Sequence, residues 1–129
     1  MKHIAICENH LYSKAYQKGA KAVCEHFVAY VLKDFKATKL MKANPMKEYV
    51  NRIGLTVSKK IGGAVQRNRA KRLLREGLRL AEQENNFRKG YLIVLVARSS
   101  IVTAKSCQIK KEVEYAMRSL KMINNEKNS

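Results

Sequence analysis

The sequence predicts a single small α+β sandwich, in which a sheet of about four strands packs against three helices. Three observations support this class. The chain has 129 residues, a length that suits one domain. Hydrophobic residues make up 46% of it, which argues against a disordered basic protein. Segments of helical periodicity also alternate with short strand-like segments. We therefore expect one domain over residues 1–123 and a frayed tail over residues 124–129.

The first half of the chain is typical of one helix followed by two strands. Residues 11–18 have the composition of two helical turns, and Gly19 follows them as a helix-ending glycine. Residues 23–32 are rich in β-branched and aromatic residues, and residues 49–58 alternate apolar with polar side chains, so each segment predicts a strand. The Lys-rich residues 33–47 contain the only proline and predict a mobile connecting loop.

The clearest helix in the sequence covers residues 65–84. Its apolar residues recur at helical spacing and fall on one side: Ala70, Leu73, Leu74, Gly77, Leu78 and Ala81. The opposite side is polar and mostly cationic: Asn68, Arg72, Arg75 and Arg79. One side of this helix is therefore expected to pack against the sheet, and the other to form a cationic surface.

Two more elements complete the predicted fold. Residues 91–97 form a continuous apolar run, which is typical of a central strand covered on both faces. An amphipathic helix near the C-terminus is predicted by apolar residues at helical spacing: Ile109, Val113, Ala116, Met117 and Leu120.

The composition is strongly basic. Lys and Arg number 27 against 10 Asp and Glu, which gives a formal net charge of +17. A compact protein with this much like charge repels itself, and a polyanionic partner offsets the repulsion. The longest purely apolar run, residues 91–97, is far too short to span a membrane, and the N-terminal apolar stretch is too short for a secretory signal. We therefore expect a cytoplasmic protein that binds nucleic acid rather than a membrane.

The positive charge is concentrated in one segment. No acidic residue occurs between Glu48 and Glu76. Within this segment Gly62 and Gly63 permit close approach of a backbone, and the helix after them presents unpaired N–H groups to an anion. Arg side chains can bind phosphate through two parallel hydrogen bonds. A phosphate-binding surface and an ordinary solvated helix face both fit this pattern.

Aromatic residues on the first predicted helix offer a second candidate site. Tyr12 and Tyr16 are i,i+4 neighbours on one helix face. Exposed rings of this kind stack on nucleic-acid bases with little regard to sequence. The alternative is that both rings belong to the hydrophobic core.

The sequence shows no pattern of catalytic or metal-binding residues. Cys7, Cys24 and Cys107 lie far apart without a CxxC pair, so we expect free thiols and no zinc site. Acidic residues are scattered singly, which provides neither a metal-holding cluster nor a positioned acid and base. A pair formed by His10 and His26 is an alternative, although solvated or packing histidines are commoner. We therefore expect no catalytic residue and no cofactor in this chain.

Residues 58–76 resemble the signature of the bacterial ribonuclease P protein component. In that signature SKK and a glycine are followed by AV-x-RNR-x-KR-L-x-RE, and every element occurs here in the same order. The similarity extends upstream through residues 14–19 and 27–30, and downstream through residues 90–98 and the last helix. The RNR block is the most specific part of this resemblance.

The resemblance implies an RNA-binding accessory subunit of a ribozyme that removes the 5′ leader from precursor tRNA. In the family the catalytic centre, with its Mg²⁺, lies in the RNA, while the protein binds that RNA and holds the single-stranded leader. Contact with the catalytic RNA carries over to the RNR helix and to two lysines before it: Lys59, Lys60, Arg67, Asn68, Arg69, Lys71, Arg72 and Arg75. The leader-binding cleft carries over to Tyr12, Tyr16, Phe27 and Tyr30. The resemblance also implies a left-handed crossover around the basic helix, against the general preference.

The resemblance is incomplete, and other functions fit the charge alone. Residues 4–10 (IAICENH) stand where the family usually has a basic segment, and residues 33–47 are longer than the expected hairpin. Charge and fold by themselves also fit a structural RNA-binding protein of ribosomal type. A DNA-binding protein with its helix in a major groove is a weaker alternative, because no helix-turn-helix partner is evident. No obligate protein partner is evident either.

Overall fold

The computed structural model describes residues 4–5, 9–33, 52–85, 87 and 91–122. Most of the expected loop over residues 33–47, the start of the strand expected over residues 49–58, and the expected tail over residues 124–129 lie outside the described residues. The elements, in chain order, are β1 (Ile4–Ala5), α1 (Asn9–Lys18), β2 (Ala20–Val23), β3 (Phe27–Lys33), β4 (Arg52–Thr56), the short 3₁₀ helix η1 (Lys59–Ile61), α3 (Ala64–Glu84), β5 (Tyr91–Ala97), the 3₁₀ helix η2 (Ser99–Thr103) and α4 (Ser106–Ser119).

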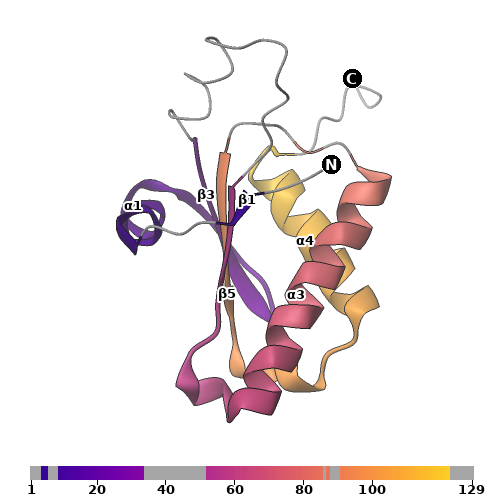
Figure 1. Cartoon of the computed structure of the whole chain (residues 1–129). Coiled ribbons are helices and arrows are strands. Elements are labelled where there is room, and N and C mark those ends of the chain that lie inside the picture. Colours follow the sequence, from indigo (N-terminus) through magenta and orange to yellow (C-terminus); the bar gives the residue numbers. More distant parts are fainter. Residues whose placement is uncertain (1–3, 6–8, 34–51, 86, 88–90, 123–129) are drawn as a thin grey trace.

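A mixed sheet with the strand order β1-β4-β5-β3-β2 forms the middle layer. β5 pairs parallel to β4 and antiparallel to β3. α1 lies on one face of the sheet, and α3 and α4 cover the other (Figure 1). The predicted α+β sandwich with three helices is confirmed, and the two-residue β1 adds a fifth strand beside β4.

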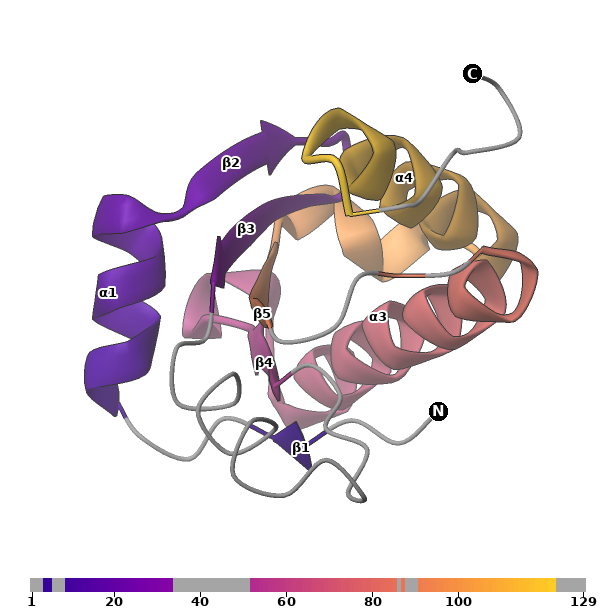
Figure 2. The same cartoon turned by 90° about the horizontal axis from the view of Figure 1, so that it is seen from above.

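The connection from β4 through α3 to β5 is left-handed. Both strands run downward in Figure 1, and α3 runs back upward on the side away from α1. Seen from above in Figure 2, the chain passes from β4 through α3 on the right to β5, which lies on the far side of β4 from β1. This hand opposes the strong general preference for right-handed crossovers, and it agrees with the topology that the resemblance implied.

β5 occupies the centre of the sheet and is covered on both faces. Ile93 and Leu95 are wholly buried in the main core, which lies between the sheet and the helices α3 and α4. Leu92 and Val94 point to the opposite face, where they form a smaller core with Ala15 of α1. The prediction of a central strand over residues 91–97 is therefore confirmed.

α3 buries the side that its periodicity predicted. Ala70, Leu74, Gly77, Leu78 and Ala81 are buried. A Cβ atom at Gly77 would collide with the side chain of Ile109, so the glycine permits the close approach of α3 and α4. No helix in the part of the chain that the structure describes is long and apolar enough to cross a membrane.

The strand predicted over residues 23–32 is instead two strands joined by a turn. β2 and β3 pair antiparallel, and the N–H group of Cys24 donates a hydrogen bond to the Phe27 carbonyl at 2.9 Å. The turn is held from α4, because Glu112 Oε1 accepts a hydrogen bond from the His26 N–H group at 2.8 Å. The turn contains no glycine, proline or asparagine, so the usual local signal of a reversal is missing.

Candidate nucleic-acid interface

α3 begins at two glycines that leave its N-terminus open. Gly62 has a φ of 144°, a conformation that L side chains rarely adopt. Gly63 is the N-cap residue and has no side chain to accept hydrogen bonds from the first-turn N–H groups. The first turn of α3 also contains no acidic residue. The positive end of the helix dipole is therefore not compensated within the helix.

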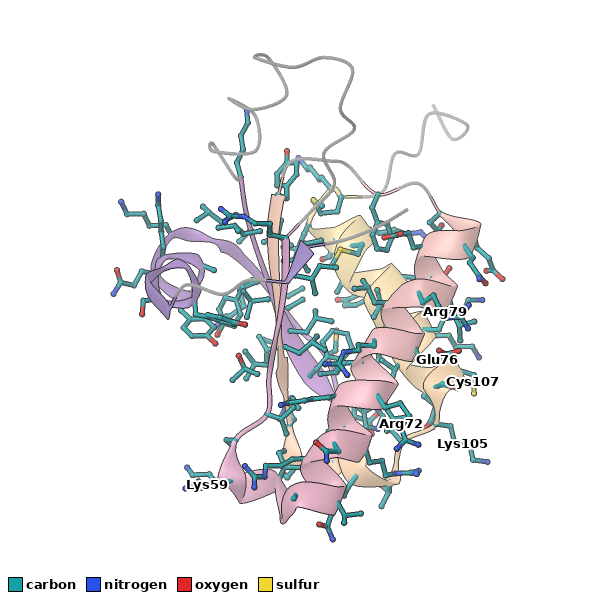
Figure 3. All side chains as sticks on the ribbon, viewed as in Figure 1. Lys59, Arg72, Glu76, Arg79, Lys105 and Cys107 are labelled. Carbon is teal, nitrogen blue, oxygen red and sulfur yellow. The ribbon has the colours of Figure 1, made fainter. Side chains whose placement is uncertain are left out.

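The exposed side of α3 carries a basic surface, which we call the cationic face: Asn68, Arg69, Arg72 and Arg75. Arg67 and Lys71 lie at its border and are half-buried, while Lys59 and Lys60 are exposed on η1. Figure 3 shows Arg72 on the side of α3 that faces away from the sheet. The structure thus places the cations expected to contact RNA along α3 and on the turn before it.

The cations of the cationic face are open to a partner. Arg72 and Arg75 form no ion pair or hydrogen bond with any residue that the structure describes. Arg69 donates one hydrogen bond, from Nε to the Val102 carbonyl at 3.2 Å, and pairs with no described acid. Arg67 Nε is buried without a hydrogen-bond partner among the described residues.

Farther along α3 the charge is internally balanced. Arg79 Nε donates a hydrogen bond to Glu76 Oε2 at 3.1 Å. This hydrogen bond raises the pKa of Arg79 and lowers the pKa of Glu76 from their ordinary values. The open cations therefore occupy the first half of the helix, and the Glu76–Arg79 pair marks where they end.

Three tyrosines, Tyr12, Tyr16 and Tyr30, form a second candidate surface on the opposite face of the sheet, which we call the tyrosine cluster. The rings of Tyr16 and Tyr30 meet edge to face with their centroids 5.0 Å apart. The Tyr16 hydroxyl lies 3.0 Å from Thr56 Oγ1 on β4, within hydrogen-bond distance. Tyr16 is 40% exposed, so its ring is accessible although it also packs on the sheet.

A family model described as Ribonuclease P matches residues 1–121. The chain belongs to the Ribonuclease P family. Its relatives include the ribonuclease P protein component of Dehalococcoides mccartyi, which is 40% identical over 70% of this chain and 73% of its own length. The ribonuclease P protein component of Clostridium botulinum is 37% identical over 78% of each chain.

Solved structures agree with this family membership. The RNase P protein of Staphylococcus aureus superimposes with a TM-score of 0.71 and 26% identity, and the match covers 95% of this chain and 100% of that one. The RNase P protein of Thermotoga maritima has a TM-score of 0.64 at 21% identity, over 97% of this chain and 100% of that one, which shows the shared fold. The family places the chain among the protein components of ribonuclease P, in tRNA processing.

The assignment of Phe27 to the leader-binding cleft, which the family resemblance suggested, is wrong. Its side chain is 0% exposed and belongs to the main core beneath α3 and α4. Tyr30 lies on the other face of the same strand, packed with the smaller core under α1. Residues three apart in a strand point to opposite faces, so the sequence already contained the signal that separates Phe27 from Tyr30. Base stacking by the three tyrosines stays a prediction.

The histidine and cysteine side chains do not form a catalytic group in the described part of the chain. His26 is buried, and its Nδ1 atom bonds Glu112 Oε2, which directs the ring toward α4. The structure does not describe the side chain of His10 or any part of Cys7, so the suggested His10–His26 pair stays a prediction. Burial, together with the charge of Glu112, raises the pKa of the Cys24 thiol to about 11. A thiol held in its protonated form is a poor nucleophile.

Sequence reasoning missed two residues that position these surfaces. Thr56 holds the Tyr16 hydroxyl, and Glu112 joins the turn between β2 and β3 to α4. Both contacts link residues far apart in the chain, so periodicity gives no sign of them. Within the described ranges, no group of three or more His, Cys, Asp or Glu is placed to hold a metal ion.

Proposed function

We propose that the cationic face of α3 binds the catalytic RNA of ribonuclease P, and that the tyrosine cluster holds the 5′ leader of precursor tRNA. The RNA performs the hydrolysis, and the protein binds the catalytic RNA and orients the leader of the substrate. The observation that carries the proposal is the open row of cations at the start of α3, where Arg72 and Arg75 have no partner among the described residues. The proposal includes the cytoplasmic location that the sequence favours.

The chemistry of the cationic face suits a phosphate backbone. Each planar guanidinium group of Arg69, Arg72 and Arg75 can donate two parallel hydrogen bonds to phosphate oxygens. The uncapped N-terminus of α3 adds backbone N–H donors that also attract an anion. Arg67 Nε is buried without a partner among the residues that the structure describes, and such an orphaned donor costs about 1–3 kcal/mol. Turning this guanidinium toward a phosphate removes that cost on binding.

The tyrosine cluster suits a single strand of variable sequence. The Tyr16 ring is held between Tyr30 and the Thr56 hydroxyl, so little rotamer freedom is left to lose when a base stacks on it. Stacking on an aromatic ring contributes about 1–3 kcal/mol per base and tolerates any base. Leaders that differ between tRNAs are therefore bound by a common mechanism.

The described residues are not arranged for hydrolysis. A protein nuclease uses a cluster of metal ligands or a positioned acid and base, and the described acids are scattered or occupied in contacts such as those of Glu76 and Glu112. We therefore assign the reaction, with the Mg²⁺ that the family resemblance implies, to the RNA subunit. In this proposal the chain increases the affinity for precursor tRNA and orients that substrate.

Reconstitution with a bacterial ribonuclease P RNA at low Mg²⁺ tests the proposal. The protein should increase cleavage of precursor tRNA and should favour a substrate with a leader over one without it. Tyr16→Ala should lose most of this leader preference, because a stacking platform is removed. Arg72→Ala should instead weaken holoenzyme assembly and leave the preference of the assembled enzyme unchanged.

Tyr16→Phe serves as the matched variant, since it keeps the ring and loses only the hydroxyl that meets Thr56. It should retain most of the leader preference. A protein that neither stimulates cleavage nor discriminates by leader would contradict the proposal. Co-purification with ribosomal subunits rather than with one RNA species would favour the structural RNA-binding alternative instead.

A further inference from the structure

The outer side of α4 carries an aromatic ring between two cations. Lys111, Tyr115 and Arg118 recur at helical spacing, and all three are exposed. Tyr115 is 61% exposed, so its ring is accessible to a partner. An open hollow of about 410 Å³ lies beside it, lined by Lys111, Glu114, Tyr115, Arg118 and Ser119. We call Lys111, Tyr115 and Arg118 the outer stripe of α4.

Both acidic residues of α4 accept hydrogen bonds from residues outside this helix. Glu112 bonds His26 at the turn between β2 and β3. Glu114 borders the hollow, but its Oε2 atom accepts a hydrogen bond from Asn85 Nδ2 at 2.7 Å, at the end of α3. Lys111 and Arg118 pair with no acid in the described part of the chain. The outer stripe is therefore cationic, with its charge available to an anionic partner.

The outer stripe and the cationic face of α3 belong to the same helical layer. α3 and α4 pack side by side on one face of the sheet (Figures 1 and 2). Ile109, Val113, Ala116 and Met117 are the buried residues of α4, and Lys111 and Arg118 lie opposite them on the helix. Figure 3 shows Cys107, one turn before Lys111, on the same outward side as Arg72 and Arg79 of α3.

We propose that the outer stripe of α4 is a second contact for the catalytic RNA, in which an unpaired base stacks on Tyr115 and the flanking phosphates meet Lys111 and Arg118. This inference rests on the proposed function, because it extends the RNA surface of α3 onto the neighbouring helix. Charge complementarity selects the partner: the chain carries +17, and two of its cations lie in the stripe, where no described acid pairs with them.

The combination of residues is that of a single-stranded nucleic-acid site. Such sites pair aromatic rings, on which bases stack, with cations that follow the backbone. The hollow of about 410 Å³ is open at the surface, so a nucleobase can reach the exposed ring of Tyr115. An unpaired nucleotide of a folded RNA presents a base for stacking and a phosphate for the cations at the same time.

Equilibrium binding of the full-length protein to a bacterial ribonuclease P RNA, measured over a range of salt concentrations, tests the inference. Tyr115→Ala should weaken binding by about 5-fold or more, as expected for loss of one stacked base, whereas Tyr115→Phe should bind like the unaltered protein. Lys111→Gln combined with Arg118→Gln should flatten the dependence of log affinity on log salt by about 0.7–0.9 for each phosphate that is no longer neutralised.

Lys110→Gln is the matched control. It removes the same charge from the neighbouring position, where the side chain faces α3 and pairs with Glu84 at 2.7 Å. It should flatten the salt dependence by less than the value of about 0.7–0.9 expected for each cation of the outer stripe that meets a phosphate. Cys107 adds an independent readout, because this exposed thiol should be alkylated more slowly when RNA covers the helix.

The result for Arg72→Ala separates the inference from the proposed function. If Arg72→Ala weakens RNA binding while the outer-stripe variants bind normally and Cys107 stays reactive, the inference is overturned and the proposed function stands. If Arg72→Ala also binds normally, the proposed function itself fails. If Tyr115→Ala abolishes self-association in sedimentation and leaves RNA binding unchanged, the stripe is a protein interface and the inference is overturned.

Discussion

Tyr12 lies against Gly54 of β4, where an added side chain would collide with the tyrosine ring. A Cβ atom at Gly54 would lie 2.5 Å from Tyr12 Cε1 and 2.6 Å from the Tyr12 hydroxyl oxygen. The absent side chain therefore lets the ring of Tyr12 rest on the strand itself. The next tyrosine along α1, Tyr16, meets β4 through the Thr56 hydroxyl instead. Single side chains thus fix how α1 and its tyrosines sit on the sheet.

Gly54→Ala should displace Tyr12 and lower the free energy of unfolding by about 1–3 kcal/mol, the usual cost of overpacking. Urea unfolding measures this change, and the same variant should lose leader preference in reconstitution. In the background Tyr12→Ala the clash is absent, so Gly54→Ala should cost much less there. Equal costs in both backgrounds would show that the ring does not constrain this position.

At the scale of elements, the turn between β2 and β3 depends on α4. Glu112 accepts hydrogen bonds from the N–H group and from Nδ1 of His26, while Cys24 Sγ donates to the Glu112 carbonyl at 3.6 Å. These contacts join the hairpin to the helix on the far side of the main core. The hairpin in turn presents Tyr30 on its other face, so α4 helps to position the tyrosine cluster indirectly.

Glu112→Ala should lower the free energy of unfolding by about 1–3 kcal/mol, because it leaves polar groups of the buried His26 without partners. Hydrogen exchange should quicken at the turn between β2 and β3. Glu84→Ala removes the same type of side chain from an exposed ion pair with Lys110, and its effect should be much smaller. Equal losses of stability in the two variants would contradict a specific role for Glu112.

For the whole molecule, the sheet separates two surfaces of different chemistry. The cationic face of α3 lies on one side and the tyrosine cluster on the other (Figure 2). A protein built in this way can contact a folded RNA and a single strand at the same time. With a net charge of +17, its association with RNA should be accelerated by electrostatic attraction and weakened by salt.

Affinity for the catalytic RNA should therefore fall steeply as salt increases. Arg72→Ala should flatten the slope of log affinity against log salt by about 0.7–0.9, the value for one phosphate contact. Arg79→Ala is the matched control on the same helix, since Arg79 already pairs with Glu76, and it should flatten the slope less. An unchanged slope for Arg72→Ala would mean that the cationic face is turned to solvent in the complex.

Much of the fold and of the basic site could be predicted locally. The alternation of apolar and cationic residues over residues 65–84 predicted both the buried side and the exposed side of α3, because helical spacing alone decides which residues share a face. The apolar run over residues 91–97 predicted the central strand, because a strand covered on both faces carries apolar side chains at successive positions. The RNR block at Arg67, Asn68 and Arg69 pointed to the family through residue identity and order alone.

The sequence by itself determined which segments form the main helix and the central strand, where the positive charge is concentrated and which family the chain resembles, because each follows from residues close together in the chain. Only the tertiary structure decided that residues 23–32 contain a reversal, since the contact between His26 and Glu112 joins residues 86 positions apart. It also decided that the face of β3 with Phe27, and not the face with Tyr30, packs beneath α3 and α4, and that the crossover through α3 is left-handed. Those features depend on which elements pack together, and local patterns of hydrophobicity carry no information about that choice.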